Sequence, residues 1–554
     1  MGVRRSTYGD AEMGSAPALV RQRLHGAVAV VKAHRRRRDA VGGRAVEHRR
    51  TWKWIGVGAL LSVLMRLRMF WSPVTVDEGG YLAIARAWAH GKVLYRDVWV
   101  DRPQGLLVLF RTWDWLSGGS TSSIRIMAML FGVVLVAATA VTVRELFSDV
   151  AARWAAIICG VVSASPVLEG HTANGELLSG AMSAAGLAVA AIGLSKPRPL
   201  RWFFGSGVLA GVALSLKQSG FDGLLALGAW LFVGAIAMPR TRRTALRYLG
   251  ALAAGLSSVL AVLMIHGALT GWSRWWTAVA GYRLRVQSGF ASAEWSNLVR
   301  TFPFAAAVLG AGAVAAVAGA ACVIGGARRR SSTRLPARSL LLVVWVFTAA
   351  AAFFIGGGYW RHYWLLLAAP ISALASVALS RIHKLTPIVL TAIVAPCLAI
   401  SMWVFVASSQ TINVRATDDR RSPIDQLVGQ WFISHRHSGD NMYVMCSSAA
   451  VYADAHQDPG YPYLWNTEVH QGPNSQRLLV AYLLDTRRAP RYIAQYQSPS
   501  SCDSSGRVKR IMRREYHRIT TVAYVGIFER NVRTLGAVDR PSNGRLRGAI
   551  RSVS

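Results

Sequence analysis

The chain has 554 residues, of which 53% are hydrophobic, and its mean hydropathy is +0.31. The apolar residues form long runs rather than amphipathic stripes, which excludes a water-soluble globular protein and predicts a polytopic α-helical membrane protein. The formal net charge of +36 does not indicate nucleic-acid binding, because the basic residues lie mainly in the N-terminal tail, the short connections between apolar runs and the polar C-terminal region.

The N-terminal segment is rich in arginine and has no periodicity of a core-forming element. We therefore expect residues 1–51 to be a disordered basic tail in the cytoplasm. The first apolar run, 52–71, is too long for a secretory leader and no small-residue cleavage site follows it. It is predicted to remain as a membrane anchor.

Two adjacent carboxylates, Asp77 and Glu78, follow this run in the segment SPVTVDEGGYLAIARAW. Paired acids next to a membrane helix are energetically costly, so they indicate a functional site. The alternative is that they only begin the helix that GGYLAIARAW predicts, since acids favour a helix N-terminus.

Apolar runs long enough to span a membrane occur at eleven places, so we predict about 11 transmembrane helices, with 11–13 possible. The runs are 52–71, 124–146, 150–168, 175–194, 202–217, 221–238, 245–269, 298–326, 338–357, 361–380 and 386–408. They define a transmembrane domain over 52–408.

The charges of the connections predict the orientation. Lys and Arg mark short cytoplasmic loops, and the basic connections are 144–153, 196–201, 239–247, 327–338 and 381–384. Alternation then places the other connections outside, namely 72–123, 169–176, 216–220, 270–297, 357–364 and everything after about 409.

One apolar stretch, 104–119, is short and carries Arg111 and Asp114. If it spanned, all later connections would change sides and the basic loops would face outward. We therefore predict a helix that lies in the membrane interface.

The composition changes at about residue 409. Strands are predicted at 442–448, 490–496 and 521–530, and helices at 423–437 and 477–488, so residues 409–531 are expected to form an extracytoplasmic α/β domain. The last residues, 532–554, are expected to be disordered.

The five cysteines are weakly informative. Cys446 and Cys502 lie in the predicted extracytoplasmic domain and either form a disulfide or stay free. The other three, Cys159, Cys322 and Cys397, fall within apolar runs and are expected to be small core residues.

The predicted outer connections carry cations suited to a lipid-linked phosphate at membrane depth. They are Arg102, Lys217, Arg274, Arg283, Arg285 and the Arg361–His362 pair. A nearby aspartate could accept the proton of an acceptor hydroxyl while these cations stabilise a departing phosphate. Single cations at helix ends also extend to lipid headgroups without any catalytic role, and His171 and Glu176 could be an ordinary polar residue and a helix cap.

The ordered set of motifs resembles the GT-C glycosyltransferases. It consists of Asp-Glu soon after the first helix, a basic residue before Pro103 in the same connection, Lys217 in LKQSG, an aromatic and basic turn at 357–364, and a terminal soluble domain. Within this superfamily, the chain is most similar to the group of protein O-mannosyltransferases and lipid A aminoarabinose transferases. The resemblance covers roughly 52–530.

The resemblance implies an inverting transfer of a sugar, such as mannose, arabinose or a related one, from polyprenyl phosphate to an acceptor hydroxyl at the outer face of the plasma membrane. It implies that Asp77 is the base and that Glu78 orients the acceptor or the sugar. Arg102 stands where the aminoarabinose transferases have Lys-Pro-Pro. The implied donor-phosphate residues are Arg102, Lys217, Arg283 and Arg285, and the implied residues of the sugar or acceptor pocket are Asp101, His171, Glu176, Arg361 and His362.

No cofactor is expected. The oligosaccharyltransferase branch uses a divalent metal with several acidic ligands, and Glu176 and His171 could complete such a set, but the connections show no second acidic pair. The expected partners are the lipid-linked sugar, membrane lipids and an acceptor glycan, lipid or protein. A multi-span transporter or flippase, and a scaffold or receptor with a partner-binding C-terminal domain, are the alternatives.

Overall fold

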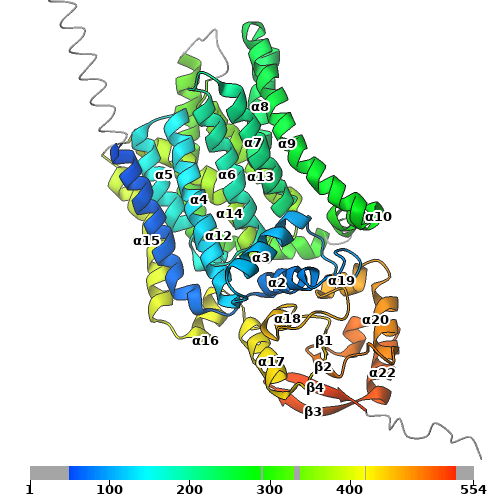
Figure 1. Ribbon diagram of the computed structural model, residues 1–554. Coiled ribbons are helices and arrows are strands. Elements are labelled where there is room, and N and C mark those ends of the chain that lie inside the picture. The colour runs from blue at the N-terminus through cyan, green and yellow to red at the C-terminus, as the bar shows by residue number, and fades with distance from the viewer. Residues whose placement is uncertain (1–48, 288–290, 330–336, 383, 418, 532–554) are drawn as a thin grey trace, which may run out of the picture.

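The structure of the protein is a computed structural model that describes residues 49–287, 291–329, 337–382, 384–417 and 419–531 (Figure 1). The tail predicted at 532–554 lies outside these residues. So does the tail predicted at 1–51, apart from its last three residues, which already belong to the first helix, Arg49–Trp71.

Each of the eleven predicted apolar runs is helical. The bundle consists of the first helix, α4 (Ile124–Leu146), α5 (Asp149–Val162), α6 (Gly175–Gly193), α7 (Pro199–Leu216), α8 (Asp222–Ala237), α9 (Arg242–Thr270), α12 (Ala291–Arg329), α13 (Leu340–Gly356), α14 (Leu365–Leu379) and α15 (Thr386–Val406). Within the described ranges, eight helices are long and apolar enough to span a membrane, and α8 and α13 are shorter apolar helices. The protein is therefore a polytopic helical membrane protein, as predicted.

The connections fall at two opposite ends of the bundle. The basic connections meet at one end, where Arg338 donates a 2.8 Å hydrogen bond to the Leu194 carbonyl and the Arg381 guanidinium lies over the Phe147 ring. At the other end the C-terminal domain is attached (Figure 1), and Gln218 donates to the Asp101 carbonyl at 2.8 Å. The division of connections into two sets by charge is therefore also a division in space.

Two short helices lie across the end of the bundle that faces the C-terminal domain. They are α2 (Val76–Ala89) and α3 (Gln104–Leu116) (Figure 1). With 13 residues, α3 is about 20 Å long, which is too short for a hydrocarbon core of about 30 Å. Its last turn exposes Trp115 and Leu116, as suits a helix in the interface. The same end carries α10 (Trp272–Trp276) and α11 (Tyr282–Gln287).

The C-terminal domain contains a four-stranded sheet with the order β1-β2-β4-β3. The strands are β1 (Met442–Met445), β2 (Tyr492–Gln495), β3 (Tyr516–Val522) and β4 (Val525–Arg530); β1 and β2 are parallel and the other pairs antiparallel. The prediction of one strand over 521–530 was wrong, because the chain turns at Ala523, which adopts a positive φ of 53°, and forms a β3–β4 hairpin.

Helices surround this sheet, and two of them match the predicted ones. The helices are α17 (Ser422–His435), α18 (Ala450–Asp454), α19 (Asn466–Gln471), α20 (Ser475–Leu484), α21 (Pro499–Cys502) and α22 (Arg507–Glu515). The short α16 (Ser409–Thr411) instead follows α15 at the edge of the bundle (Figure 1). Cys446 and Cys502 form a disulfide between the end of β1 and α21. Cys159 and Cys397 are buried as expected, but Cys322 is exposed on the surface of α12, so its prediction as a core residue was wrong.

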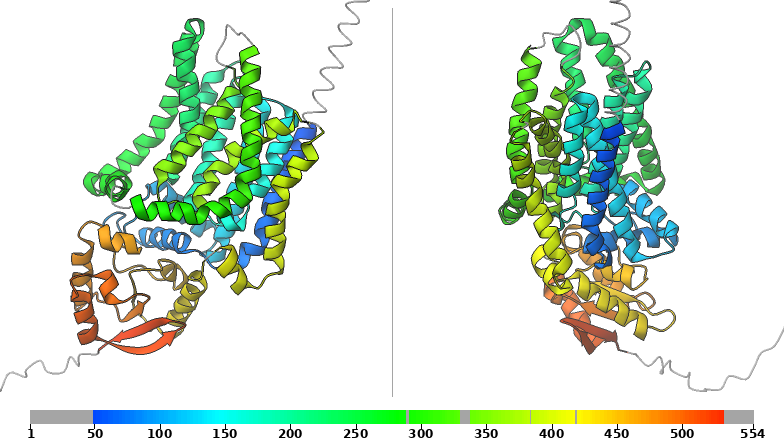
Figure 2. Two further views of the ribbon diagram at one scale, coloured as in Figure 1. Left: turned by 180° about the vertical axis from the view of Figure 1, so that it is seen from behind. Right: turned by 90° about the vertical axis from the view of Figure 1, so that its left-hand side faces the viewer.

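The C-terminal domain packs directly on α2. A Cβ added to Gly79 would lie 2.4 Å from Ala450 of α18, and one added to Gly80 would lie 2.4 Å from the Trp465 ring. The two glycines after Asp77 and Glu78 are therefore required by this close approach. At the edge of the bundle, the first helix and α15 lie side by side, as both views of Figure 2 show.

Candidate active site

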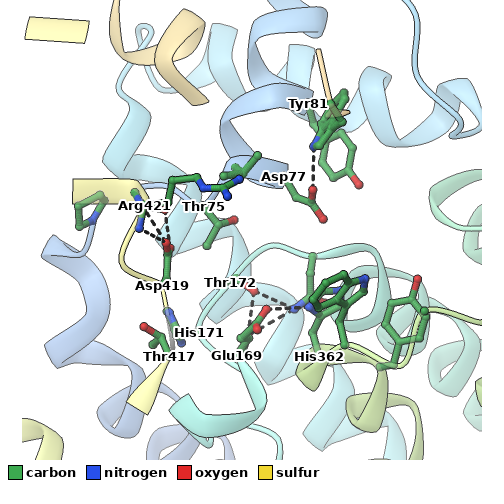
Figure 3. Close-up of a pocket in the computed structure, with 18 of the residues that line it drawn as sticks. Thr75, Asp77, Tyr81, Glu169, His171, Thr172, His362, Thr417, Asp419 and Arg421 are labelled. Carbon is green, nitrogen blue, oxygen red and sulfur yellow. Dashed lines mark hydrogen bonds and ion pairs between the residues drawn. The ribbon is translucent and has the colours of Figure 1, made fainter. Parts of the chain in front are cut away.

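A cavity of about 710 Å³ lies between the end of the bundle and the C-terminal domain (Figure 3). The membrane domain contributes Arg125 and residues from the segments 69–81, 100–102, 169–174, 282–283 and 358–363, though neither Glu78 nor Arg361 is among them. The C-terminal part contributes residues from 413–417, 419–422 and 465–468 together with Tyr524. The cavity is therefore formed largely by the connections that the sequence places on one side of the membrane.

The N-terminus of α2 directs its two acids to different places. A capping box holds this terminus, with the Glu78 carboxylate accepting a hydrogen bond from the Thr75 backbone N–H at 2.9 Å. Asp77 faces the cavity, whereas Glu78 points into the protein and is fully buried. Consecutive helical residues point about 100° apart, so adjacent acids can have unrelated surroundings.

The Glu78 carboxylate accepts hydrogen bonds from several groups of the protein. Arg125 Nη1 lies 2.5 and 2.6 Å from its two carboxylate oxygens, and the Ala173 backbone N–H donates at 2.7 Å. Glu78 does not line the cavity. It thus joins α2 to α4 and to the connection before α6. The role in orienting the acceptor or the sugar, which the resemblance implies, stays a prediction.

Asp77 is half-exposed at the cavity wall, across from Glu169 and His362 (Figure 3). Its Oδ1 accepts a hydrogen bond from the Trp465 indole N–H at 3.0 Å. The remaining lone pairs of the carboxylate can accept a proton or a hydrogen bond from a molecule in the cavity.

Asp101 holds two arginines at another part of the wall. Arg102 Nη1 lies 2.7 Å from its Oδ1 and Arg283 Nε lies 2.5 Å from its Oδ2. Burial alone would raise the pKa of Asp101, but the positive charges of Arg102, Arg283 and Lys217 outweigh it and lower that pKa. This three-residue group therefore carries a net positive charge, and the buried Nε of Arg102 has no hydrogen-bond partner among the described residues.

Behind the wall, Lys217 forms an ion pair with Glu176 and lies over the Tyr363 ring. The chain of contacts continues to the cavity through His362, whose Nε2 is 3.8 Å from Glu176 and whose Nδ1 is 2.7 Å from Glu169. Lys217 and Glu176 do not line the cavity, whereas His362 and Glu169 do. Phosphate binding by Lys217, which the resemblance implies, stays a prediction, and in this structure the ammonium is paired with Glu176.

His171 lies in the cavity wall and is buried. Burial, and then the positive charges of Arg125 and Arg66, lower its pKa well below the usual value, so the ring is neutral at pH 7. Its Nδ1 has no partner within the described part of the chain.

Three other arginines that the sequence selected do not line the cavity. The Arg361 guanidinium stacks over the Phe304 ring at 3.8 Å, and Arg285 is exposed; neither lines the cavity. Arg274 lies in a different depression, beside α9 and the turn after α2. Of the arginines at 274–285, only Arg283 contributes to the site.

Several residues of the site were missed by sequence reasoning. They are Arg125, Glu169, Tyr282, Trp465 and Glu468. An arginine at the start of an apolar run was a usable signal for Arg125. The residues of α19 and the segment before it carry no such signal, because only the docking of the C-terminal domain on α2 brings them to Asp77.

Glu468 is the most unusual of these residues. It is buried in the cavity wall and its Oε2 has no partner among the described residues. Burial, and then the negative charge of Asp101, raise its pKa well above the usual value. The raised pKa extends the pH range over which Glu468 is protonated, and in that form it can donate a hydrogen bond into the cavity.

The residues present do not suit a metal ion. In the described ranges, no group of three or more His, Cys, Asp and Glu side chains has the arrangement of a metal site. Glu176, one of the two residues that the sequence suggested could complete a metal site, is already paired with the Lys217 ammonium.

The comparisons with known proteins agree with this architecture. The family model described as dolichyl-phosphate-mannose-protein mannosyltransferase matches residues 101–265. Among solved structures, ArnT from Cupriavidus metallidurans bound to undecaprenyl phosphate has a TM-score of 0.58 at 12% identity, covering 86% of this chain and 97% of that chain. The comparison with curated proteins gave no match.

Oligosaccharyltransferases have the same fold. AglB from Archaeoglobus fulgidus, in complex with an inhibitory peptide and a dolichol-phosphate, has a TM-score of 0.53 at 12% identity, covering 89% of this chain and 75% of that chain. The oligosaccharyltransferase of the same organism tethered to an acceptor peptide has a TM-score of 0.52 at 11% identity, covering 84% and 72%. The resemblance to the GT-C superfamily is therefore confirmed at the level of the fold.

Proposed function

We propose that the protein is a glycosyltransferase that moves a sugar from a polyprenyl-phosphate donor to an acceptor hydroxyl, with Asp77 as the base. The observation that carries this proposal is the placement of the half-exposed Asp77 carboxylate and the positively charged Asp101–Arg102–Arg283 group on the wall of one cavity. A base and a phosphate-binding cation are the two groups that this reaction needs.

In the proposed reaction, the acceptor oxygen forms a bond to the anomeric carbon of the sugar as the bond from that carbon to the phosphate oxygen breaks. The acceptor proton passes to Asp77, and the phosphate leaves with the bonding electrons. Because the acceptor attacks opposite to the leaving group in a single displacement, the configuration at this carbon inverts.

Arg102 and Arg283 would bind the donor phosphate. Asp101 pairs with both guanidinium groups, but its single negative charge neutralises only one of their two positive charges. The Nε of Arg102, which has no partner among the described residues, supplies a further hydrogen-bond donor. Arginine suits phosphate because its planar N–H groups can form paired hydrogen bonds with phosphate oxygens. Developing charge on the departing phosphate would then be stabilised by groups that are already in position.

The lipid part of the donor has a suitable apolar surface nearby. A groove of about 400 Å³ is lined by Leu298, Val299, Phe302, Ala350, Phe353, Phe354, Trp364 and Leu367, and it lies beside the turn at 358–363 that reaches the cavity. We propose this groove for the first isoprene units. The undecaprenyl phosphate in the ArnT structure and the dolichol-phosphate in the AglB structure support a donor of this class.

The test uses purified full-length protein in lipid nanodiscs with undecaprenyl-phosphate mannose and undecaprenyl-phosphate arabinose as donors and an envelope extract as acceptor. For the wild type we expect release of undecaprenyl phosphate and labelling of the acceptor. For D77N we expect kcat to fall by at least 1,000-fold, while the variant inserts into the membrane and has the unfolding midpoint of the wild type. Near-normal turnover by D77N would exclude Asp77 as the base. Flux of the donor across proteoliposomes without any product would favour a flippase.

We also propose that the cavity and the C-terminal domain face away from the cytoplasm. The alternation of basic connections and the Cys446–Cys502 disulfide support this orientation. In a background in which the exposed Cys322 is replaced by Ser, an impermeant thiol reagent added to intact cells should label Q471C but not S195C. The opposite pattern would reverse the orientation.

A further inference from the structure

We propose that Trp465 of the C-terminal domain is a positioning residue for Asp77, so that this domain is a working part of the active site. This inference rests on the proposed function of Asp77 as the base. The inference goes beyond that function by naming a residue of the C-terminal domain that determines the orientation of the Asp77 carboxylate.

The first observation is the hydrogen bond itself. The indole N–H of Trp465 lies 3.0 Å from Asp77 Oδ1, and among the residues that the structure describes it is the one hydrogen-bond donor to this carboxylate. Asp77 and Glu78 are adjacent, but only Glu78 is held by an arginine and by backbone N–H groups. The orientation of Asp77 therefore depends on a single contact, and that contact comes from 388 residues away in the chain.

The second observation is that the Trp465 ring is itself fixed. It packs against the Tyr81 ring, with centroids 5.7 Å apart, and against the face of α2 at Gly80, where a Cβ would lie 2.4 Å from the ring. Tyr81 is one turn after Asp77 on α2, so the ring contacts the same helix at two further points. A side chain held in this way can fix the position of a hydrogen-bond donor.

The consequence for the reaction follows from the two oxygens of the carboxylate. With Oδ1 engaged by the indole, Oδ2 is left to accept the proton of an acceptor hydroxyl in the cavity. If the hydrogen bond were lost, the Asp77 side chain would be free to rotate, and fewer of its conformations would place an oxygen at the acceptor. Donor binding, which depends on Arg102 and Arg283, would be unaffected.

The test compares two Trp→Phe substitutions in the full-length protein in nanodiscs. W465F keeps an aromatic ring against Tyr81 but removes the N–H group. W431F is the matched control, because Trp431 is also a half-buried tryptophan of the C-terminal domain but contacts His435 and Tyr492 and does not line the cavity.

The expected result for W465F is a kcat about 10- to 100-fold below that of the wild type, the range expected from one lost hydrogen bond to a charged group, with KM for undecaprenyl-phosphate mannose or arabinose within twofold. W431F should match the wild type in both respects.

A second variant perturbs the Trp465–Asp77 hydrogen bond without changing either of these two residues. G80A introduces a methyl group against the Trp465 ring and should lower kcat with little change in KM. This variant decides the matter if W465F does not fold. Wild-type kcat in whichever of the two variants folds would overturn the proposal, as would a loss confined to KM.

Failure of the proposed function gives a different pattern. If wild type and D77N both transfer sugar at the same rate, or neither does, the proposed function is wrong and the role of Trp465 falls with it. If the wild type is active, D77N is inactive and W465F is as active as the wild type, only the positioning role is wrong.

Discussion

Glu78 and Arg125 form a fully buried ion pair that joins α2 to the start of α4, with Nη1 of Arg125 2.5 and 2.6 Å from the two carboxylate oxygens. Arg125 Nη2 also donates to the Pro73 carbonyl, before α2 begins. The pair thus fixes the helix that presents Asp77 to the cavity. Its neighbour in the sequence, Asp77, is half-buried and lines the cavity, so the two adjacent acids have different surroundings.

Removal of one charge of this pair should destabilise the protein strongly. In E78Q the Arg125 charge would stay buried without a counterion, which typically costs about 3–5 kcal/mol of unfolding free energy. We expect a clear fall in the midpoint of thermal unfolding in detergent. The control is R96Q, which breaks the exposed Arg96–Asp97 pair and should leave the midpoint unchanged. Equal midpoints for E78Q and the wild type would contradict the structural role.

The two arginines of α11 should differ in their importance for the donor. R283Q removes a guanidinium that lines the cavity beside Asp101, so kcat/KM for undecaprenyl-phosphate mannose or arabinose should fall by about 100-fold, equivalent to about 2.7 kcal/mol. R285Q changes an exposed side chain outside the cavity and should stay within threefold of the wild type. A larger loss in R285Q than in R283Q would show that the wrong arginine has been assigned to the phosphate.

The disulfide should matter for the C-terminal domain alone. It closes a loop with a sequence separation of 56 residues, and loss of a native disulfide from a small domain typically costs about 2–5 kcal/mol. We expect C446S/C502S to lower the unfolding midpoint of this domain. C322S, which changes a free cysteine on the surface of α12, serves as the control and should have no effect. An unchanged midpoint in the double variant would argue against the disulfide.

Two acids of the C-terminal domain, the buried Asp425 and the half-buried Asp454, predict how its stability depends on pH. Burial raises the pKa of Asp425 in α17 to about 7, and burial together with the charge of Asp425 raises the pKa of Asp454 in α18 to about 7. The folded state therefore binds protons that the unfolded state, with carboxyl pKa values near 4, has already lost. The resulting stability is fully present below about pH 4 and is lost as the pH rises through 7.

The measurement is the unfolding midpoint between pH 5 and pH 8. The wild type should become less stable over this range, by at most about 1.4 kcal/mol per pH unit for each acid, and D425N should show a smaller decrease. D454N should also show a smaller decrease, because burial raises the pKa of Asp454 as well. A steeper decrease in D425N than in the wild type would reverse the sign of the argument.

Much of the fold follows from local patterns. Membrane-length apolar runs identified every helix of the bundle, because a spanning segment must satisfy its own backbone hydrogen bonds and shield them with apolar side chains. The charges of short connections sorted those connections into the two ends of the bundle. The prediction of a single strand at 521–530 was wrong, because the two-residue turn at Ala523 and Tyr524 contains no glycine, asparagine or proline that would indicate a turn.

The sequence alone identified Asp77, Arg102 and Arg283 as candidates, because acids and arginines beside a membrane are rare enough to be informative. Which of two adjacent acids faces the cavity, and which of two nearby arginines reaches it, depends on the rotation of short helices that pack against other parts of the chain. Local sequence does not encode that rotation. For the same reason, the sequence does not identify Trp465 and Glu468 as residues of the site. Trp465 becomes a neighbour of Asp77 only when the C-terminal domain packs on the two glycines of α2.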